Sequence, residues 1–186
     1  MLCVIGDLVE DVVVWLPQKL SYGTDTPAKI VRTRGGSAAN VAVFAAAISS
    51  PDRPGSRLIA QVGDDDLGER LVAELVDADV DPCVVRSGRT GSIVVIVSPD
   101  GERTMITDRA AAIELADAPV GWSTGVSILH VPAYSLFSGS NQCGQQASNR
   151  RGKEMQNLRF DRRFFGLVDQ RFWRETISRH DHRVAT

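Results

Sequence analysis

Residues 35–42 read GGSAANVA, and this stretch decides the fold of the chain. The two glycines end a segment, residues 28–33, in which polar and apolar side chains alternate as in a half-exposed strand. Ser37 follows and can cap a helix, and the Ala-rich residues 38–48 have helical propensity with little polar surface. The stretch predicts a strand, a tight turn and a largely buried helix.

The same stretch is suited to binding a ligand. Glycines let a ligand approach the backbone closely, and the amides of a first helical turn offer hydrogen-bond donors. Taken alone, however, residues 35–42 are explained as well by a tight strand-to-helix turn without a ligand.

Strand-like and helix-like segments alternate along the chain. An amphipathic helix is predicted over residues 67–76, and Pro-Asp-Gly at 99–101 predicts a hairpin, because Pro fixes one turn dihedral and Gly supplies a positive φ. Strands followed by helices, more than once, predict an α/β layered sheet. Further strands are predicted over residues 2–5, 12–15, 57–62, 83–86, 92–97, 103–107 and 126–131.

The composition is that of a globular protein. The chain has 186 residues, 43% hydrophobic and 24% charged, with a formal net charge of −2, which does not indicate a general nucleic-acid binder. No apolar run approaches the roughly 18 residues that a membrane span needs, and the N-terminal stretch lacks signal-peptide features. We expect a cytoplasmic protein.

Cys3, Cys83 and Cys143 are odd in number and lack metal-ligand spacing, so we expect reduced thiols.

The chain changes character near Ser140. Residues 1–140 contain 11 Lys and Arg against 18 Asp and Glu, whereas residues 141–186 contain 10 against 5. Beyond Ser140 the bulky apolar residues follow no sustained period, although residues 149–158 have some helical potential. We therefore separate an N-terminal part, 1–140, from an atypical basic tail, 141–186.

Residues 35–42 resemble the N-terminal signature of the ribokinase-like (PfkB) carbohydrate kinases, a Gly-Gly-x-x-x-Asn stretch that holds substrate hydroxyls. The spacing matches Asn40 to the family asparagine and Gly35 and Gly36 to its glycines. GDLVED, residues 6–11, resembles the family's first strand and turn, where an aspartate at the position of Asp11 accepts hydrogen bonds from the sugar. A carboxylate suits this work, because it accepts from two donors and charged acceptors make stronger bonds.

Other stretches agree with the family in order and separation. VGDDDLG, residues 62–68, resembles a Val-Gly-x-Asp-x-x-Gly loop that begins a helix, and the helix dipole explains its aspartates better than a metal site does. Residues 100–104 and 107–111 resemble the hairpin and following strand of these kinases. There Arg103 is a candidate to bind a substrate phosphate or another anion, with a surface salt bridge as the alternative. Residues 24–33 fit the small β lid that covers the sugar.

The resemblance implies a ribokinase-like three-layer α/β/α sheet with a small β lid, truncated, comprising residues 1–140. It implies an ATP-dependent kinase, with Mg²⁺, that phosphorylates a hydroxymethyl group of a sugar or nucleoside. The implied substrate-binding residues are Asp11, Gly35, Gly36, Asn40 and Arg103. It also implies a homodimer formed through the lid.

The family's catalytic motif is absent. In these kinases a C-terminal Gly-Ala-Gly-Asp at a helix start supplies an anion hole and the catalytic base. The only glycines after Ser140 are Gly144, Gly152 and Gly166, and no Asp follows any of them. We therefore expect no catalytic residue, no ATP binding, and impaired or no activity in this chain. A single-base frameshift near codon 140 is our hypothesis for the tail.

Two other functional classes stay open. The chain could be a non-catalytic sugar-binding protein, because the residues matched to sugar binding are all present. Nucleic-acid binding through the basic, aromatic-containing residues 159–183 is the least favoured class, because an out-of-frame reading of GC-rich DNA also encodes many arginines.

Overall fold

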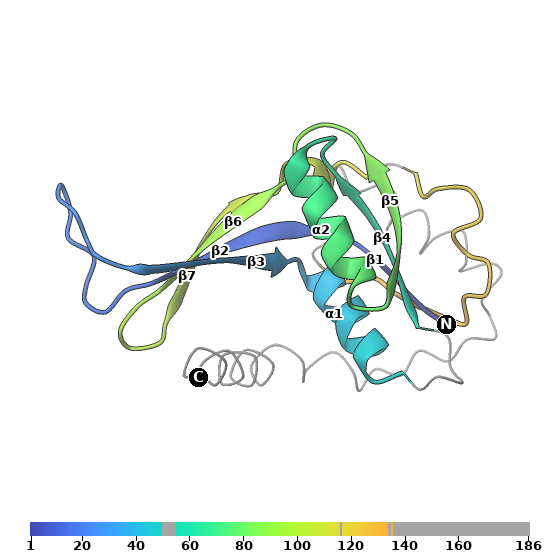
Figure 1. Cartoon of the computed structure of the whole chain (residues 1–186), viewed down its shortest axis with the longest axis horizontal. Helices are drawn as coiled ribbons and strands as arrows, with labels where there is room; N and C mark the ends of the chain where they lie inside the picture. The colour runs from blue at the N-terminus through green and yellow to red at the C-terminus, as the bar shows by residue number, and fades with distance from the viewer. Residues whose placement is uncertain (50–54, 116, 134, 136–186) are drawn as a thin grey trace. The chain divides into compact units, whose positions relative to one another are not determined.

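The computed structural model describes residues 1–49, 55–115, 117–133 and 135. This part of the chain contains two four-stranded sheets, two α-helices and one short 3-10 helix (Figure 1). The tail, with its predicted helix over residues 149–158 and with Cys143, lies outside the described residues. No helix in the described ranges is long and apolar enough to cross a membrane.

The first sheet is parallel throughout, with the strand order β5-β4-β1-β8. The inner strand β1 is a continuous apolar run, and the middle of the inner strand β4, residues 58–60, is apolar and buried, because both faces of a central parallel strand are covered. The strands are β1 (Leu2–Ile5), β4 (Ser56–Val62), β5 (Val80–Arg86) and β8 (Ile128–His130).

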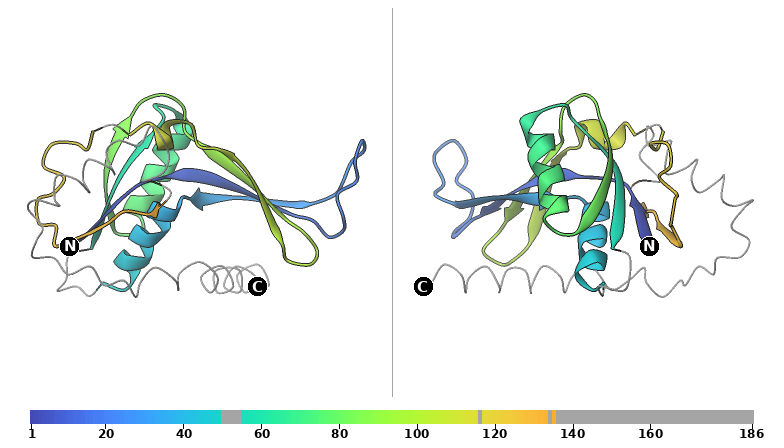
Figure 2. Two further views of the ribbon diagram at one scale, coloured as in Figure 1. Left: turned by 180° about the vertical axis from the view of Figure 1, so that it is seen from behind. Right: turned by 45° about the vertical axis from the view of Figure 1, so that its right-hand side comes forward.

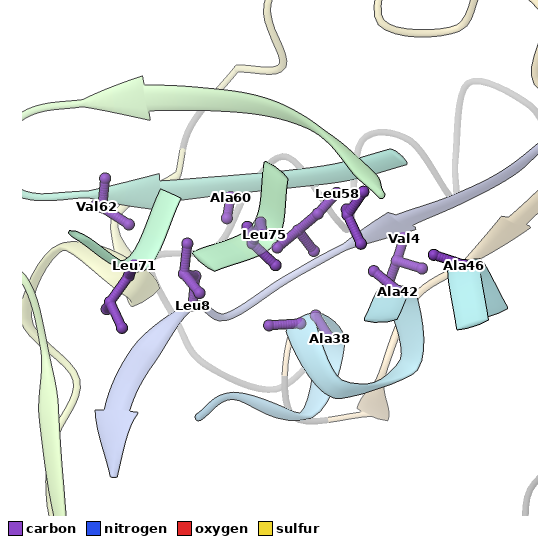
Figure 3. Packing of buried hydrophobic residues seen from close by; sticks show 12 residues of the cluster. Val4, Leu8, Ala38, Ala42, Ala46, Leu58, Ala60, Val62, Leu71 and Leu75 are labelled. Atoms are coloured by element: carbon purple, nitrogen blue, oxygen red, sulfur yellow. The ribbon is translucent and has the colours of Figure 1, made fainter. Parts of the chain in front are cut away.

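Two helices, α1 (Ser37–Ala47) and α2 (Asp66–Val76), pack on one face of this sheet. In α1, the small side chains at positions 38, 42 and 46 form one buried stripe against Val4 and Leu58 (Figure 3). On the opposite face, Cys3, Ile5 and Ile59 pack against Leu115. These layers confirm the predicted α/β architecture.

The second sheet is the lid. Its strands β2 (Val9–Trp15), β3 (Lys29–Gly35), β6 (Ser92–Val97) and β7 (Arg103–Asp108) have the order β3-β2-β6-β7. They extend away from α1 and α2 (Figures 1 and 2). Only a short bend at residues 6–8 separates β1 from β2, so the chain passes directly from the core into the lid. The predicted turn at residues 99–101 joins β6 and β7, and Gly101 has a φ of +85°.

Some predicted boundaries are wrong. Strand β2 begins at Val9 and not at residue 12, and β8 has three residues where six were predicted. Strand β5 begins at Val80 and includes Pro82, where a start at residue 83 was predicted. A proline is tolerated there because β5 lies at the edge of its sheet.

The prediction that α1 is largely buried is only partly right. The positions that face the sheet are buried, but Phe44 is 45% exposed and Ile48 is 71% exposed. Ser37 is also not the helix cap: the N-cap is Gly36, which has no side chain, and Ser37 begins the helix itself.

Candidate functional site

Gly35 and Gly36 connect the lid to α1, and both lie against acidic residues. A Cβ atom on Gly35 would lie 2.3 Å from Cγ of Asp11, and one on Gly36 would lie 2.4 Å from the carbonyl oxygen of Asp7. Gly36 also has a φ of +103°, which L side chains rarely adopt. The groups that lie close to these two glycines are protein groups, from the β1–β2 bend and from β2, and the close approach of a ligand stays a prediction.

Asp7 caps helix α1 from 30 residues upstream. Its Oδ1 accepts hydrogen bonds from the Ala38 amide and the Ser37 hydroxyl, each at 3.0 Å. Its main-chain oxygen accepts a third bond from the Ala39 amide at 3.3 Å. Nη1 of Arg109 lies 3.8 Å from the other carboxylate oxygen. A carboxylate here is favourable, because the helix N-terminus carries partial positive charge.

Asp11 is a buried carboxylate on β2, 7% exposed, at the level of Thr33 on β3. Burial and, to a smaller extent, the negative charge of Asp7 raise the pKa of Asp11 to about 6, although the positive charge of Arg34 opposes both effects. Asp11 is therefore ionised at neutral pH and becomes protonated in mild acid.

Asn40 lies in the first turn of α1, and its side chain is bonded to Arg34. Nη1 of Arg34 donates to Oδ1 of Asn40 at 3.2 Å. Burial lowers the pKa of Arg34, and the charges of Glu74 and Asp11 oppose that effect, so both carboxylates lie near the guanidinium. Arg34 thus connects Asn40 with Asp11. Four of the five predicted site residues, Asp11, Gly35, Gly36 and Asn40, gather around this turn.

Arg34 was missed by the sequence analysis. Its only signal was its place directly before the double glycine, in a strand where charged residues alternate with apolar ones. The contact with Asn40 depends on how the turn folds back, which the pattern does not encode.

Arg103 is not part of this cluster. It begins β7 at the level of Val97, whereas Asp11 is at the level of Ile93, four residues along β6. Arg103 is exposed at the far end of the lid. The structure does not bring it together with the other predicted site residues, and anion binding by Arg103 stays a prediction.

A network of charges lies beside the site. Glu10, whose side chain is 3% exposed, accepts from Nη1 of Arg32 at 2.8 Å and from Nη2 of Arg70 at 2.6 Å. Arg70 also pairs with Glu74 at 2.6 Å. Since Glu10 is on β2 and Arg70 is on α2, the Glu10–Arg70 pair joins the lid strand to the helix.

The second glycine-rich loop is also held by an aspartate. Asp65 caps α2 by accepting from the Gly68 amide at 2.8 Å, and its other oxygen accepts from the Thr90 amide at 2.8 Å. The Thr90 hydroxyl donates to Asp65 and accepts from the Gly63 amide. This confirms the helix-start explanation of the aspartates. Within the described residues, no three His, Cys, Asp or Glu side chains come close enough to hold a metal ion.

Comparison with known proteins places these features in a family. The model described as pfkB family carbohydrate kinase matches residues 1–180, a range that continues beyond Ser140. Ribokinase from Thermotoga maritima is 26% identical with a TM-score of 0.54, over 62% of this chain and 38% of the ribokinase. The chain thus spans well under half of that relative. No curated protein matches.

Two further solved structures show the same fold. A fructokinase from Xylella fastidiosa is 22% identical with a TM-score of 0.64, over 82% of this chain and 47% of its own. An uncharacterized sugar kinase from Pyrococcus horikoshii is 22% identical with a TM-score of 0.67, over 86% of this chain and 56% of its own. The ribokinase-like α/β fold predicted from the sequence is therefore confirmed.

Proposed function

Because the chain belongs to the pfkB family of carbohydrate kinases, we propose that residues 1–140 form the sugar-binding part of such a kinase. The substrate is a sugar or nucleoside with a free hydroxymethyl group. In a complete kinase of this family, that group would receive the phosphoryl group of ATP.

One observation carries this proposal: a desolvated carboxylate, Asp11, and an amide, Asn40, gather at a double-glycine turn together with Arg34, which donates to Asn40 and whose charge acts on Asp11. An ionised carboxylate only accepts hydrogen bonds, whereas an amide NH₂ donates them. Sugar hydroxyls do both, so the pair is complementary to a polyol. Gly35 and Gly36 have no side chains, so Asp11 and the backbone of Asp7 can lie directly against this turn.

We infer that the described residues do not bind ATP. Nucleotide phosphates are commonly held by the free amides of a helix N-terminus. In each α-helix of the described part, an aspartate already accepts from a first-turn amide: Asp7 accepts from Ala38 in α1, and Asp65 accepts from Gly68 in α2. The sequence also contains no Gly-Ala-Gly-Asp motif. As the second candidate function, we therefore propose a non-catalytic sugar-binding protein: the chain binds sugar and transfers no phosphate.

Calorimetric titration with D-ribose, D-fructose and adenosine, with and without ATP and Mg²⁺, tests the proposal. We expect one of these ligands to bind, with no ADP formed. Asp11→Asn and Asn40→Ala should each weaken binding about tenfold or more, since each removes a hydrogen bond to the ligand. Asp100→Asn, the same change in the exposed β6–β7 turn, is the matched control. Equal binding by the Asp11 and Asp100 variants would disprove that Asp11 binds the sugar. ADP formation would disprove that the chain is non-catalytic.

A further inference from the structure

We infer that Arg34 is a positioning residue: it fixes the amide of Asn40 so that Asn40 donates hydrogen bonds to the substrate and does not accept them. The inference rests on the proposed sugar binding and deepens it, because it states which substrate groups the site recognises.

The orientation of the amide follows from the chemistry of the contact. A guanidinium has five N–H donors and no acceptor, so the atom of Asn40 that faces Arg34 at 3.2 Å must be the carbonyl oxygen. Asn40 therefore uses Oδ1 on the protein, and both protons of its NH₂ group stay available. Without Arg34, either end of the amide could turn toward a ligand.

Arg34 is itself held by compensating charges. The carboxylate of Glu74 lies near its guanidinium, and Glu74 is paired with Arg70, which is paired in turn with the buried Glu10. Negative and positive side chains thus alternate from Glu10 through Arg70 and Glu74 to Arg34. Because Glu74 and Asp11 already balance its charge, Arg34 does not require an anionic group on the substrate.

The two binding groups then have opposite roles. Asp11 can only accept, and Asn40, held by Arg34, only donates. The matching ligand is an uncharged polyol that offers one hydroxyl proton to Asp11 and one hydroxyl oxygen to Asn40. The positive charge of Arg34 also lowers the pKa of Asp11, against burial, which extends the pH range in which Asp11 accepts.

The test compares Arg34→Met and Arg34→Lys with the control Arg32→Met. Arg32 is two residues away on β3, so the control removes the same charge from the same strand, but its guanidinium binds Glu10. Chains labelled with ¹⁵N-asparagine report the side-chain amide of Asn40 without any ligand, and Asn40→Ala assigns the signal. Titrations with D-ribose and D-fructose from pH 5 to 8.5 report affinity.

We expect Arg34→Met to shift the Asn40 amide signals, to weaken sugar binding about tenfold at pH 8, and to raise the pH at which binding is half lost. Arg34→Lys keeps the charge, so it should keep the pH midpoint while affinity falls less. Arg32→Met should leave the amide signals unchanged and affinity within twofold. A role limited to stability would lower the melting temperature without moving the pH midpoint.

Unchanged Asn40 amide signals in Arg34→Met would overturn the inference, and so would equal losses in Arg34→Met and Arg32→Met. If Arg34→Met does not fold, Arg34→Lys decides: a pH midpoint that moves in spite of the retained charge contradicts the inference. If the unaltered chain binds none of D-ribose, D-fructose and adenosine, the proposed function fails and the substrate role of Arg34 fails with it. The ligand-free amide signals would still show whether Arg34 holds Asn40.

Discussion

At the residue scale, the carboxylate of Asp11 lies buried against Gly35, with its pKa raised from 3.8 to about 6. In that interval the folded chain binds more protons than the unfolded chain. The contribution of Asp11 to stability is therefore complete below about pH 4 and is lost as the pH rises through 6. Its ability to accept hydrogen bonds from a ligand increases over the same interval. Stability and binding thus respond to pH in opposite directions.

Asp11→Asn should separate these two effects. The amide carries no charge to bury, so we expect a higher free energy of unfolding at pH 7.5, by up to roughly 3 kcal/mol at about 1.4 kcal/mol for each pKa unit. At pH 4, where Asp11 is protonated, the difference should vanish. Urea denaturation at the two pH values measures this. An equal effect at both pH values would show that the Asp11 charge is not the cause.

Gly36 should tolerate alanine much less well than Gly101 does. Both residues have positive φ angles, but a Cβ on Gly36 would meet the Asp7 backbone, whereas a Cβ on Gly101 would have no atom within 4 Å. We expect Gly36→Ala to cost roughly 3 kcal/mol or more of stability, and Gly101→Ala roughly 1 kcal/mol. Thermal unfolding of the two variants gives the comparison. Similar losses would mean that backbone strain alone, and not the close approach, makes glycine necessary at position 36.

The sequence predicted those residues of the candidate site that lie at a fixed spacing within a short stretch of the chain. Asn40, Gly35 and Gly36 belong to one short stretch, and Asp11 belongs to a second. It missed Arg34 and assigned the helix cap to Ser37, because both contacts depend on folding. Asp7 reaches the start of α1 only because β2 pairs with β3, which places Val9 beside Gly35, and a pattern of neighbouring residues does not contain that contact.

At the scale of elements, Thr90 ties the β5–β6 loop to the start of α2. It is 1% exposed, and its hydroxyl serves both Asp65 and the Gly63 amide. Thr90→Val keeps the shape and removes both bonds, which leaves the buried Gly63 amide without its partner and takes one hydrogen bond from Asp65. We expect a loss of roughly 2–4 kcal/mol at pH 7, measured by urea denaturation. Thr90→Ser keeps the hydroxyl and should lose about 1 kcal/mol.

The penalty of Thr90→Val should depend on pH. Burial raises the pKa of Asp65, but the hydrogen bonds from Thr90 and Gly68 and the charge of Arg89 outweigh burial, so the pKa lies below its usual range. The stabilisation from these bonds is present above about pH 4 and is lost as Asp65 becomes protonated at lower pH. The difference between Thr90→Val and Thr90→Ser should therefore shrink below pH 3. A constant difference would exclude the ionised form of Asp65 as its source.

Elements defined by local chemistry were predicted well. The bounds of β6 follow from its continuous β-branched run, its hairpin turn follows from Pro-Asp-Gly, and both are confirmed. The start of β5 was predicted too late, because a proline within a short segment normally indicates the end of a strand, and Pro82 directly precedes the predicted start. Only the position of β5 at the sheet edge, a property of the whole sheet, makes that proline acceptable.

At the scale of the whole molecule, one face of the lid exposes apolar side chains. The register places Ile30 level with Val14 and Ile96, and Ile106 level with Val94 and Val12, two positions along the same strands. Since alternate residues share a face, these side chains lie together. Ile30 is 61% exposed and Ile106 is 58% exposed. An apolar sheet face of this kind favours association with a second copy.

We therefore predict that the chain self-associates through the lid. The double variant Ile30→Lys, Ile106→Lys should weaken dimer formation about tenfold or more in sedimentation velocity, because burying either ammonium group in an apolar contact is costly. Ile48→Lys, at a 71% exposed position near the end of α1, is the matched control and should leave the dimer intact. If the Ile48 variant dissociates the dimer and the lid variant does not, association occurs through α1. A chain that stays monomeric at all concentrations would exclude the lid as an interface between copies.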